Sequence, residues 1–301
     1  MSKHFINLDD LSLNALESII TNAIEIKQQH LSGKINKDLE NKTLAMIFDK
    51  SSTRTRVSFE AGMAQLGGHA LFLSEKDIQL GRGEPITDSA IVISSMVDAV
   101  MLRISSHEDI TTFAKHSSVP VINALSDESH PCQLLADIMT YQEHKGNITG
   151  KTVAWIGDGN NMCHTYMQAA KVFGFTLNIA TPMDYKPSQK FQDQYANHIC
   201  MFENASEACE NADMVLTDVW ASMGQESEMK KRQMAFKDFQ VNSALMKQAK
   251  QDAVFMHCLP AHRDEEVTSE VIDGSQSLVW AEAENRLHAQ KALLLYLLDQ
   301  S

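Results

Sequence analysis

The sequence lacks the features that mark membrane, secreted and nucleic-acid-binding proteins. None of its apolar runs approaches the roughly 20 residues of a membrane-spanning helix. Its first residues, Met-Ser-Lys-His-Phe-Ile-Asn, contain no apolar stretch of the kind that a secretory signal needs. Basic residues are scarce: 26 stand against 39 acidic ones, for a formal charge of −13. This balance argues against a nucleic-acid partner, which would require a basic face.

Cysteine is also rare and shows no pairing pattern. There are five cysteines in 301 residues, an odd number, and none of them forms a C-x-x-C pair. We therefore expect free thiols in a cytoplasmic protein, without disulfides and without a bound metal. The five are Cys132, Cys163, Cys200, Cys209 and Cys258.

A complete dinucleotide fingerprint is missing as well. Gly157-Asp158-Gly159-Asn160-Asn161 follows an apolar run and begins a helical pattern, but position 162 is methionine where the third glycine would stand. No acidic residue closes a second strand at the distance that the fingerprint requires. The sequence therefore predicts no nucleotide cofactor.

The regular pattern of the chain is an alternation of short apolar strands with helical segments. Such alternation predicts an α/β protein with parallel sheets flanked by helices. A polar turn at Lys145-Gly146-Asn147 divides the chain into a first domain, residues 1–145, and a second, residues 146–283. The strand candidates are 43–48, 69–73, 99–104 and 119–122 in the first domain, and 152–157, 176–181, 213–219, 253–257 and 277–281 in the second. A last helical segment runs from Glu282 to Leu298.

The most informative motif is Ser52-Thr53-Arg54-Thr55-Arg56, which lies between a predicted strand and a predicted helix. Backbone N–H groups at a helix start attract anions, and guanidinium groups fit phosphate oxygens. An ordinary helix cap with two solvated arginines is the alternative. Because both arginines lie in the same turn, we favour a phosphate site.

Three further polar residues stand where functional groups of α/β sheets are found. Arg103 ends an apolar strand, where a surface salt bridge would be the plain explanation. His130 and Gln133 are three residues apart at a helix start, with Pro131 between them. An imidazole can donate to a carbonyl oxygen while an amide binds an NH₂ group.

A second set of candidates follows the strands of the second domain. Asn161 opens a helix and could bind a carboxylate, and Asp218 ends a strand and could hold an ammonium group. Ser222-Met223-Gly224 continues from Asp218 into a loop that could close over a ligand. Cys258 follows another strand; it could be a small buried apolar residue, an acyl-forming nucleophile or an orienting group.

Five motifs in order resemble those of the aspartate and ornithine carbamoyltransferases. They are Ser52-Thr53-Arg54-Thr55-Arg56, His130-Pro131-Cys132-Gln133, Asp218-Val219-Trp220-Ala221-Ser222-Met223-Gly224, His257-Cys258-Leu259-Pro260 and Glu284-Asn285-Arg286. The Ser-Met-Gly and His-Cys-Leu-Pro forms are those of the ornithine branch.

The resemblance implies a reaction and an assembly. It implies that carbamoyl phosphate and L-ornithine give L-citrulline and phosphate, without a metal or an organic cofactor, in arginine synthesis or breakdown. The implied assembly is a homotrimer or a multiple of trimers, with no membrane partner. The final helix, about 284–301, is expected to pack back on the first domain.

The resemblance also implies roles for individual residues. Those implied to be catalytic are Arg56, Arg103, His130 and Cys258. Those implied to bind carbamoyl phosphate are Ser52, Thr53, Arg54, Thr55, Gln79, Arg103, His130, Gln133, Cys258, Leu259 and Arg286. Those implied to bind ornithine are Asn161, Asp218, Ser222 and Met223. Two alternatives remain open: another amine acceptor, such as putrescine or acylated ornithine, and a non-catalytic regulatory paralogue.

Overall fold

The chain folds into two compact units, one of which contains both of its ends. The structure, a computed structural model, describes residues 3–74, 83–221 and 228–299. The first unit contains residues 1–139 and 284–301, and the second contains residues 140–283. No helix in the described part of the chain combines the length and the apolar character that crossing a membrane would require.

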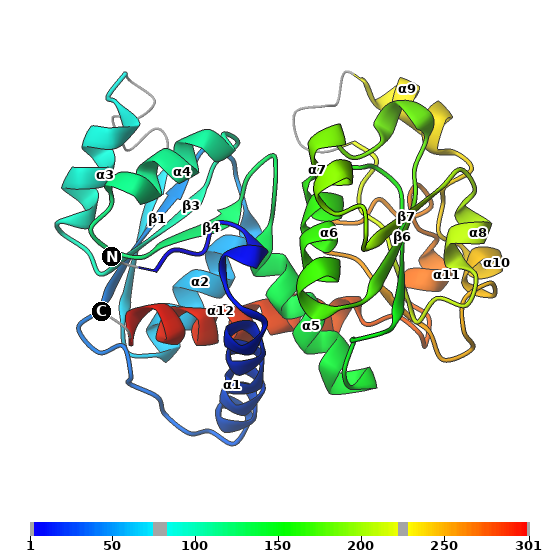
Figure 1. The fold of residues 1–301 in the computed structure, drawn as a ribbon. Coiled ribbons are helices and arrows are strands. Elements are labelled where there is room, and N and C mark those ends of the chain that lie inside the picture. Colours follow the sequence, from blue (N-terminus) through cyan, green and yellow to red (C-terminus); the bar gives the residue numbers. More distant parts are fainter. Residues whose placement is uncertain (1–2, 75–82, 222–227, 300–301) are drawn as a thin grey trace. The chain divides into compact units, whose positions relative to one another are not determined.

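The first unit is a parallel four-stranded sheet covered by helices on both faces (Figure 1). The strand order is β2-β1-β3-β4. The strands are β1 (Thr43–Phe48), β2 (His69–Ser74), β3 (Ala99–Arg103) and β4 (Val121–Leu125). The helices include α1 (Leu13–Leu31), α2 (Thr53–Gln65), α3 (Ile86–Ser94), α4 (His107–His116) and the start of α5 (Pro131–Lys145).

Buried apolar side chains on both faces of this sheet explain why it forms. Strand β1 reads Thr-Leu-Ala-Met-Ile-Phe, and every residue after the threonine is buried. Val100, Leu102 and Phe113 belong to the core between the sheet and helices α3 and α4. Continuous apolar strands of this kind are typical of parallel sheets that have helices on both faces.

The second unit is a parallel five-stranded sheet in the order β7-β6-β5-β8-β9. Its strands are β5 (Thr152–Ile156), β6 (Thr176–Ala180), β7 (Ile199–Phe202), β8 (Met214–Leu216) and β9 (Val254–Met256). Its helices are α6 (Asn161–Phe173), α7 (Gln189–Gln194), α8 (Ala205–Cys209), α9 (Met229–Phe236), α10 (Ser243–Met246) and α11 (Ser269–Ile272). This confirms the predicted fold class.

The order of the strands marks one place in each sheet where a ligand site is expected. The chain leaves β1 toward β2 on one side and returns to β3 on the other, so that β1 and β3 flank a reversal point. In the second sheet, β5 and β8 flank the equivalent point. In open α/β sheets, ligands bind outside the carboxyl ends of the strands at such a reversal.

The last helix, α12 (Val279–Leu298), packs on the first unit from residue 284 onward. Ala289, Ala292 and Leu293 on this helix are fully buried. Lys27 Nζ on α1 donates to Asn285 Oδ1 at 2.8 Å, and Lys291 Nζ donates to Gln65 Oε1 on α2 at 3.0 Å. Apolar packing and these polar contacts explain why the C-terminal helix belongs to the first unit, as predicted.

Two sequence predictions about the second sheet are wrong. Residues 277–281 were expected to form a strand, but α12 begins at Val279, and only Ser277 forms an isolated bridge, with Phe255. The helix-forming run Ala281-Glu282-Ala283-Glu284 outweighs the local β preference of Val279 and Trp280. Strand β7 was missed because it is a four-residue edge strand with only partial burial.

A buried histidine makes the first unit sensitive to acid. His288 lies on α12 with its side chain 1% exposed, and its ring is 5.8 Å from that of His30. Burial, followed by the charges of Lys291, Lys27 and His30, lowers the pKa of His288 to about 3. The unfolded chain takes up this proton near pH 6.5. Stability should therefore fall as the pH decreases from about 6.5 toward 3.

We expect His288→Leu to lose less stability on acidification than the wild type. The substitution removes the group that must stay neutral in the folded unit, so the fall in Tm between pH 7.5 and pH 5 becomes smaller. Thermal unfolding at the two pH values measures this. His116→Leu, at an exposed position of α4, is the control and should keep the wild-type dependence. Equal falls in all three proteins would contradict the prediction.

Candidate functional site

A cluster of cationic groups occupies the reversal point of the first sheet. Thr55, in the first turn of α2, is buried, and its Oγ1 accepts from Arg103 Nη1 at 3.1 Å and from Arg286 Nη2 at 3.3 Å. Arg103 is the last residue of β3 and pairs in register with Phe48 of β1. One hydroxyl thus joins the loop after β1, the end of β3 and helix α12.

His130 and Gln133 belong to the same cluster. His130 is 4% exposed, and its pKa lies well below the ordinary value because of burial and then the charges of Arg286, Arg103 and Arg54. The imidazole is therefore neutral at physiological pH and can act as an N–H donor without adding charge.

The amide of Gln133 has a defined orientation. Its Oε1 accepts from Arg286 Nη1 at 2.5 Å, and its Nε2 donates to Asp137 Oδ1 at 2.9 Å. Gln290 adds a further neutral acceptor when its amide oxygen faces Arg286, at 3.1 Å from Nε and 3.0 Å from Nη2. The guanidinium of Arg286 thus donates to uncharged oxygens of Thr55, Gln133 and Gln290.

The start of α2 completes the cluster. Ser52 is the residue that precedes the helix, and its hydroxyl makes no capping hydrogen bond. Thr53 is exposed and Arg54 is half-buried, so this helix end is accessible. Backbone N–H groups in a first turn beside three arginines form a strong anion site.

Arg56 faces a different environment from Arg54. Its Nε lies 3.1 Å from Glu60 Oε2, and its guanidinium lies 3.8 Å from the centre of the Phe72 ring. Arg54, and not Arg56, is among the charges that act on His130. The expectation of a catalytic Arg56 therefore receives no support from these contacts. Gln79 lies outside the described residues.

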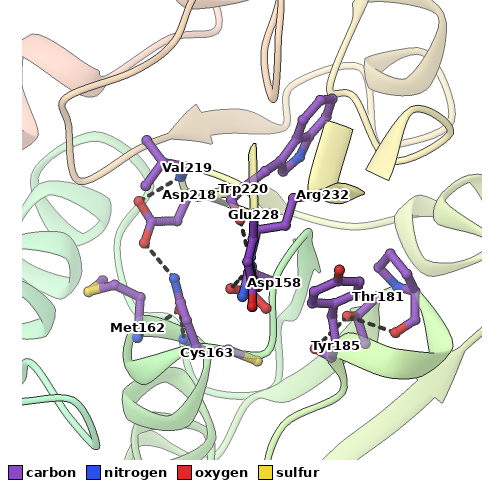
Figure 2. Close-up of polar contacts among 12 residues, drawn as sticks. Asp158, Met162, Cys163, Thr181, Tyr185, Asp218, Val219, Trp220, Glu228 and Arg232 are labelled. Carbon is purple, nitrogen blue, oxygen red and sulfur yellow. Dashed lines mark hydrogen bonds and ion pairs between the residues drawn. The ribbon is translucent and has the colours of Figure 1, made fainter. Parts of the chain in front are cut away.

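A second polar cluster occupies the reversal point of the second sheet. Asp218, two residues beyond β8, is buried, and its Oδ2 accepts from Asn160 Nδ2 at 2.7 Å. Its Oδ1 accepts from Val219 N at 2.8 Å and from Cys258 Sγ at 3.3 Å. Asn160 Oδ1 caps α6 by accepting from Met162 N and Cys163 N. Figure 2 shows Asp218 above the start of this helix.

The residues on either side of Cys258 in sequence, His257 and Leu259, are hydrogen-bonded to each other. His257 Nε2 lies 3.2 Å from Glu266 Oε1, and His257 Nδ1 accepts from Leu259 N at 2.9 Å. The second contact requires an unprotonated Nδ1, so Nε2 carries the proton and donates to Glu266. Leu259 has φ +56, a conformation that a leucine keeps only when its surroundings enforce it.

Among the residues that the structure describes, two groups of side chains have the donor atoms of a metal site. Asp218, His257 and Cys258 each offer one ligand atom, and these atoms lie within 4.8 Å of one another. The same holds for His262, Glu265 and Glu266. In the first group Asp218 and Cys258 already bond to each other, and in the second Glu266 already accepts from His257. Internal hydrogen bonding explains both groups without an ion.

Asn161, the first residue of α6, is half-buried beside Asn160. Ser222 and Met223 lie outside the described residues. Cys132, by contrast, is a buried packing residue: its Sγ donates to Asn123 O at 3.4 Å, and burial raises its pKa to about 12.

A buried ion pair adjoins the second cluster. Arg232 Nη1, on α9, donates to Asp158 Oδ2 at 2.8 Å and to the Trp220 carbonyl oxygen at 2.6 Å. Its guanidinium carbon lies 4.7 Å from the centre of the Tyr185 ring. Burial raises the pKa of Asp158 to about 6, against the lowering effect of Arg232. Figure 2 shows Arg232 between Trp220 and Asp158.

The loop after β5 is packed so closely that one position requires glycine. A Cβ on Gly159 would lie 2.2 Å from the backbone nitrogen of Pro187 and 2.5 Å from the carbonyl carbon of Lys186. Gly159 N also donates to the Tyr185 carbonyl oxygen at 2.8 Å. The position of Asn160 thus depends on close backbone packing.

We expect Gly159→Ala to destabilise the protein by about 3 kcal/mol, the upper range for overpacking against atoms that cannot move aside. Gly150→Ala serves as the comparison. Gly150 has φ +72 and nothing within 4 Å of the added Cβ, so its substitution should cost only about 1 kcal/mol of left-handed strain. Denaturant unfolding measures both. Equal losses would show that the contact with Pro187 is unimportant.

Sequence reasoning missed several residues that hold these clusters together. Asn160 was passed over in favour of Asn161, although an asparagine directly before a helix is a capping signal. Asp158 stood in the glycine-containing loop but was not singled out. Arg232 follows Met229-Lys230-Lys231 in a charged stretch that resembles a solvated surface. Glu266 and Gln290 gave no signal in the sequence.

The two clusters define a class of protein. It is a two-unit α/β protein with a cluster of arginines beside a helix start in one unit and a carboxylate–thiol cluster in the other.

Comparison with known proteins gives the family. Residues 3–143 match the model of the aspartate/ornithine carbamoyltransferase carbamoyl-P binding domain, and residues 149–297 match that of the family's Asp/Orn binding domain. The chain belongs to the aspartate/ornithine carbamoyltransferase family.

Individual relatives cover nearly the whole chain. An ornithine carbamoyltransferase from Ruthia magnifica is 75% identical over 99% of this chain and 100% of that protein. One from Hydrogenovibrio crunogenus is 62% identical over 99% of both. The solved ornithine carbamoyltransferase from Pyrococcus furiosus is 49% identical, with a TM-score of 0.95, over 100% of this chain and 98% of that one. That from Burkholderia thailandensis is 51% identical, with a TM-score of 0.92, over 98% of both.

Proposed function

We propose that this protein transfers the carbamoyl group of carbamoyl phosphate to the δ-amine of L-ornithine, which gives L-citrulline and phosphate. The observation that carries the proposal is the convergence of Arg54, Arg103 and Arg286 on a buried neutral His130 in a protein of net charge −13. An acidic protein that gathers three arginines in one place has the local positive charge that holds an anion. The family and the names of its relatives support the same reaction.

We assign carbamoyl phosphate to residues 1–145 with 284–301. Ser52, Thr53, Arg54 and Thr55 hold the phosphate through backbone N–H groups, hydroxyls and a guanidinium. Arg103, Thr55 and His130 donate to the carbonyl oxygen as it gains negative charge, which is an oxyanion-type stabilisation. Gln133 accepts from the carbamoyl NH₂ group through Oε1, the atom that already faces Arg286.

We assign ornithine to residues 146–283. Asn161 binds the α-carboxylate, and Asp218 holds the amino groups together with Ser222 and Met223. An alkyl amine with a pKa near 10 is mostly protonated at neutral pH, whereas attack on the carbonyl carbon requires the free base. Asp218 and Cys258, whose Oδ1 and Sγ lie 3.3 Å apart, present two groups that can accept or pass on a proton. Cys258 orients the amine; no acyl-cysteine is needed, because the amine displaces phosphate directly.

The test is an assay of citrulline and of phosphate release with a panel of acceptors. Purified protein with carbamoyl phosphate should release phosphate and form a ureido product with L-ornithine. Putrescine, N-acetyl-L-ornithine and L-aspartate should each react at a small fraction of that rate. Faster turnover of one of these would reassign the acceptor. Failure with all four would support a regulatory paralogue and contradict the proposal.

We further propose self-association as a trimer or a multiple of trimers. Large apolar side chains are exposed on α2, on the edge strand β2, and on and just after α3. Exposed apolar groups around a strand edge are typical of an interface. The exposed apolar residues of α2, β2 and the α3 region are Val57, Leu71, Ile91, Val92 and Met96. Sedimentation should give a particle of at least three chains of 33.6 kDa each.

A cytoplasmic location is also proposed, because none of the five cysteines forms a disulfide.

A further inference from the structure

The loops that follow β5 and β8 are joined by two separate polar links. The first is the hydrogen bond from Asn160 Nδ2 to Asp218 Oδ2, at 2.7 Å. The second passes through Arg232, which donates both to Asp158 in the first loop and to the Trp220 carbonyl oxygen in the second. In the first loop the links start at Asp158 and Asn160, two residues apart, and in the second loop they start at Asp218 and Trp220, also two residues apart. The position of Asp218 relative to α6 therefore depends on both.

Arg232 is fixed more firmly than its sequence context suggests. It is 7% exposed on a helix whose neighbouring cations Lys230 and Lys231 are exposed. Glu228 lies 3.5 Å from its Nε, and the Tyr185 ring lies against its guanidinium. A buried arginine between a carboxylate and a carbonyl oxygen supplies geometry that a lysine reproduces only in part.

The contacts of Arg232 also join two segments that flank residues 222–227 in sequence. Trp220 precedes that stretch, and Glu228 and α9 follow it. Through Arg232, Asp158 therefore links the segments before and after the Ser-Met-Gly motif to the loop that follows β5.

We propose that Arg232 is a positioning residue for the amino-acid substrate: it holds the Asp218–Trp220 segment and α9 against the 158–160 loop, so that the groups which bind ornithine are prealigned. This deepens the proposed function and depends on it. Arg232 itself contacts no substrate, and Asp158 acts only as its partner. Arg54, Arg103 and His130, which are assigned to carbamoyl phosphate, belong to the other unit and should be unaffected.

The test is to compare the KM values of the two substrates in the full-length protein. Arg232→Met should raise KM for L-ornithine roughly tenfold, the effect of a difference of about 1.4 kcal/mol in binding. KM for carbamoyl phosphate should change by less than about twofold, as for substitutions remote from a site. Arg232→Lys, which keeps the charge beside Asp158, should give an intermediate ornithine KM. Lys231→Met, an exposed neighbour on α9, is the matched control and should equal the wild type.

Leaving Asp158 buried without its partner could unfold the second unit, so a second variant is needed. The double variant Asp158→Asn/Arg232→Met contains no unpaired buried charge and should fold, with the ornithine KM still raised. A double variant with the wild-type ornithine KM would overturn the proposal. The unpaired buried charge of Asp158 alone would then explain the raised ornithine KM of Arg232→Met. Equal rises in both KM values would also overturn it, since that indicates general destabilisation.

The failure of the inference and that of the proposed function give different results. If the wild-type protein does not turn over ornithine with carbamoyl phosphate, the proposed function fails, and the inference fails with it. If the wild-type protein does so and Arg232→Met has the same ornithine KM, only the inference fails.

Discussion

Arg103→Met is expected to lower kcat/KM for carbamoyl phosphate by about 10³-fold, the upper range for the loss of one preorganised oxyanion donor. Arg103 ends β3 at the reversal point of the first sheet and donates to Thr55 Oγ1 at 3.1 Å. Its charge also helps to keep His130 neutral. Methionine keeps most of the side-chain volume but removes both the donors and the charge. Steady-state kinetics with saturating ornithine measure the change.

The control for this prediction is Lys115→Met, which removes an exposed cation from α4 in the same unit. It should change kcat/KM by less than about twofold. Thermal unfolding of both variants shows whether the fold is kept. A folded Arg103→Met protein that retains more than about a tenth of the wild-type kcat/KM would contradict the assigned role, because a tenth corresponds to only about 1.4 kcal/mol of transition-state stabilisation.

Asp218→Asn is expected to lower kcat/KM for L-ornithine by about 10³-fold, which lies within the range for loss of a positioned acid–base group. The asparagine has the shape of the aspartate, so its Oδ1 can still accept from Val219 N and Cys258 Sγ, whereas its NH₂ group cannot accept from Asn160 Nδ2 as Oδ2 does. It removes the negative charge that holds an ammonium group and that can accept its proton. KM for carbamoyl phosphate should stay within about twofold of the wild type.

Asp252→Asn is the matched control for this substitution. Asp252 belongs to the same unit, and its side chain is 75% exposed in an ion pair with Lys145. Exposed pairs contribute little to stability, so this variant should behave as the wild type does. If Asp218→Asn raised both KM values equally, or if it matched Asp252→Asn, Asp218 would not be the ammonium-binding group.

Much of the first site could be predicted from local sequence, because its chemistry is concentrated in short motifs. Thr55, Arg103, His130 and Gln133 were singled out from the sequence and Arg286 was implied by the family resemblance, and the structure brings the five together. Strand ends and helix starts leave recognisable local signals, and in a parallel sheet these ends meet at one edge. The role of each residue in catalysis stays a prediction.

The supporting residues could not be predicted in the same way. Gln290 lies four residues beyond Arg286 on a helix whose residues are buried on several sides, so no periodicity separates it from packing residues. Arg232 lies in a lysine-rich stretch, and only the fold buries it. Glu266 bonds to His257, nine residues away, across a turn whose conformation the sequence does not reveal. Their partners are distant in sequence, and propensity carries no information about such contacts.

The sequence by itself determined the class of the fold, the positions of its strands with two exceptions, and the residue types that an anion and an amine require. Those properties follow from local periodicity and from the chemistry of single side chains. Only the tertiary structure decided that Arg54 rather than Arg56 acts on His130, and that Asn160 holds Asp218. It also decided that Arg232 is buried between Asp158 and Trp220. The direction and partner of a side chain depend on which distant segments pack beside it, and that packing is a property of the whole chain.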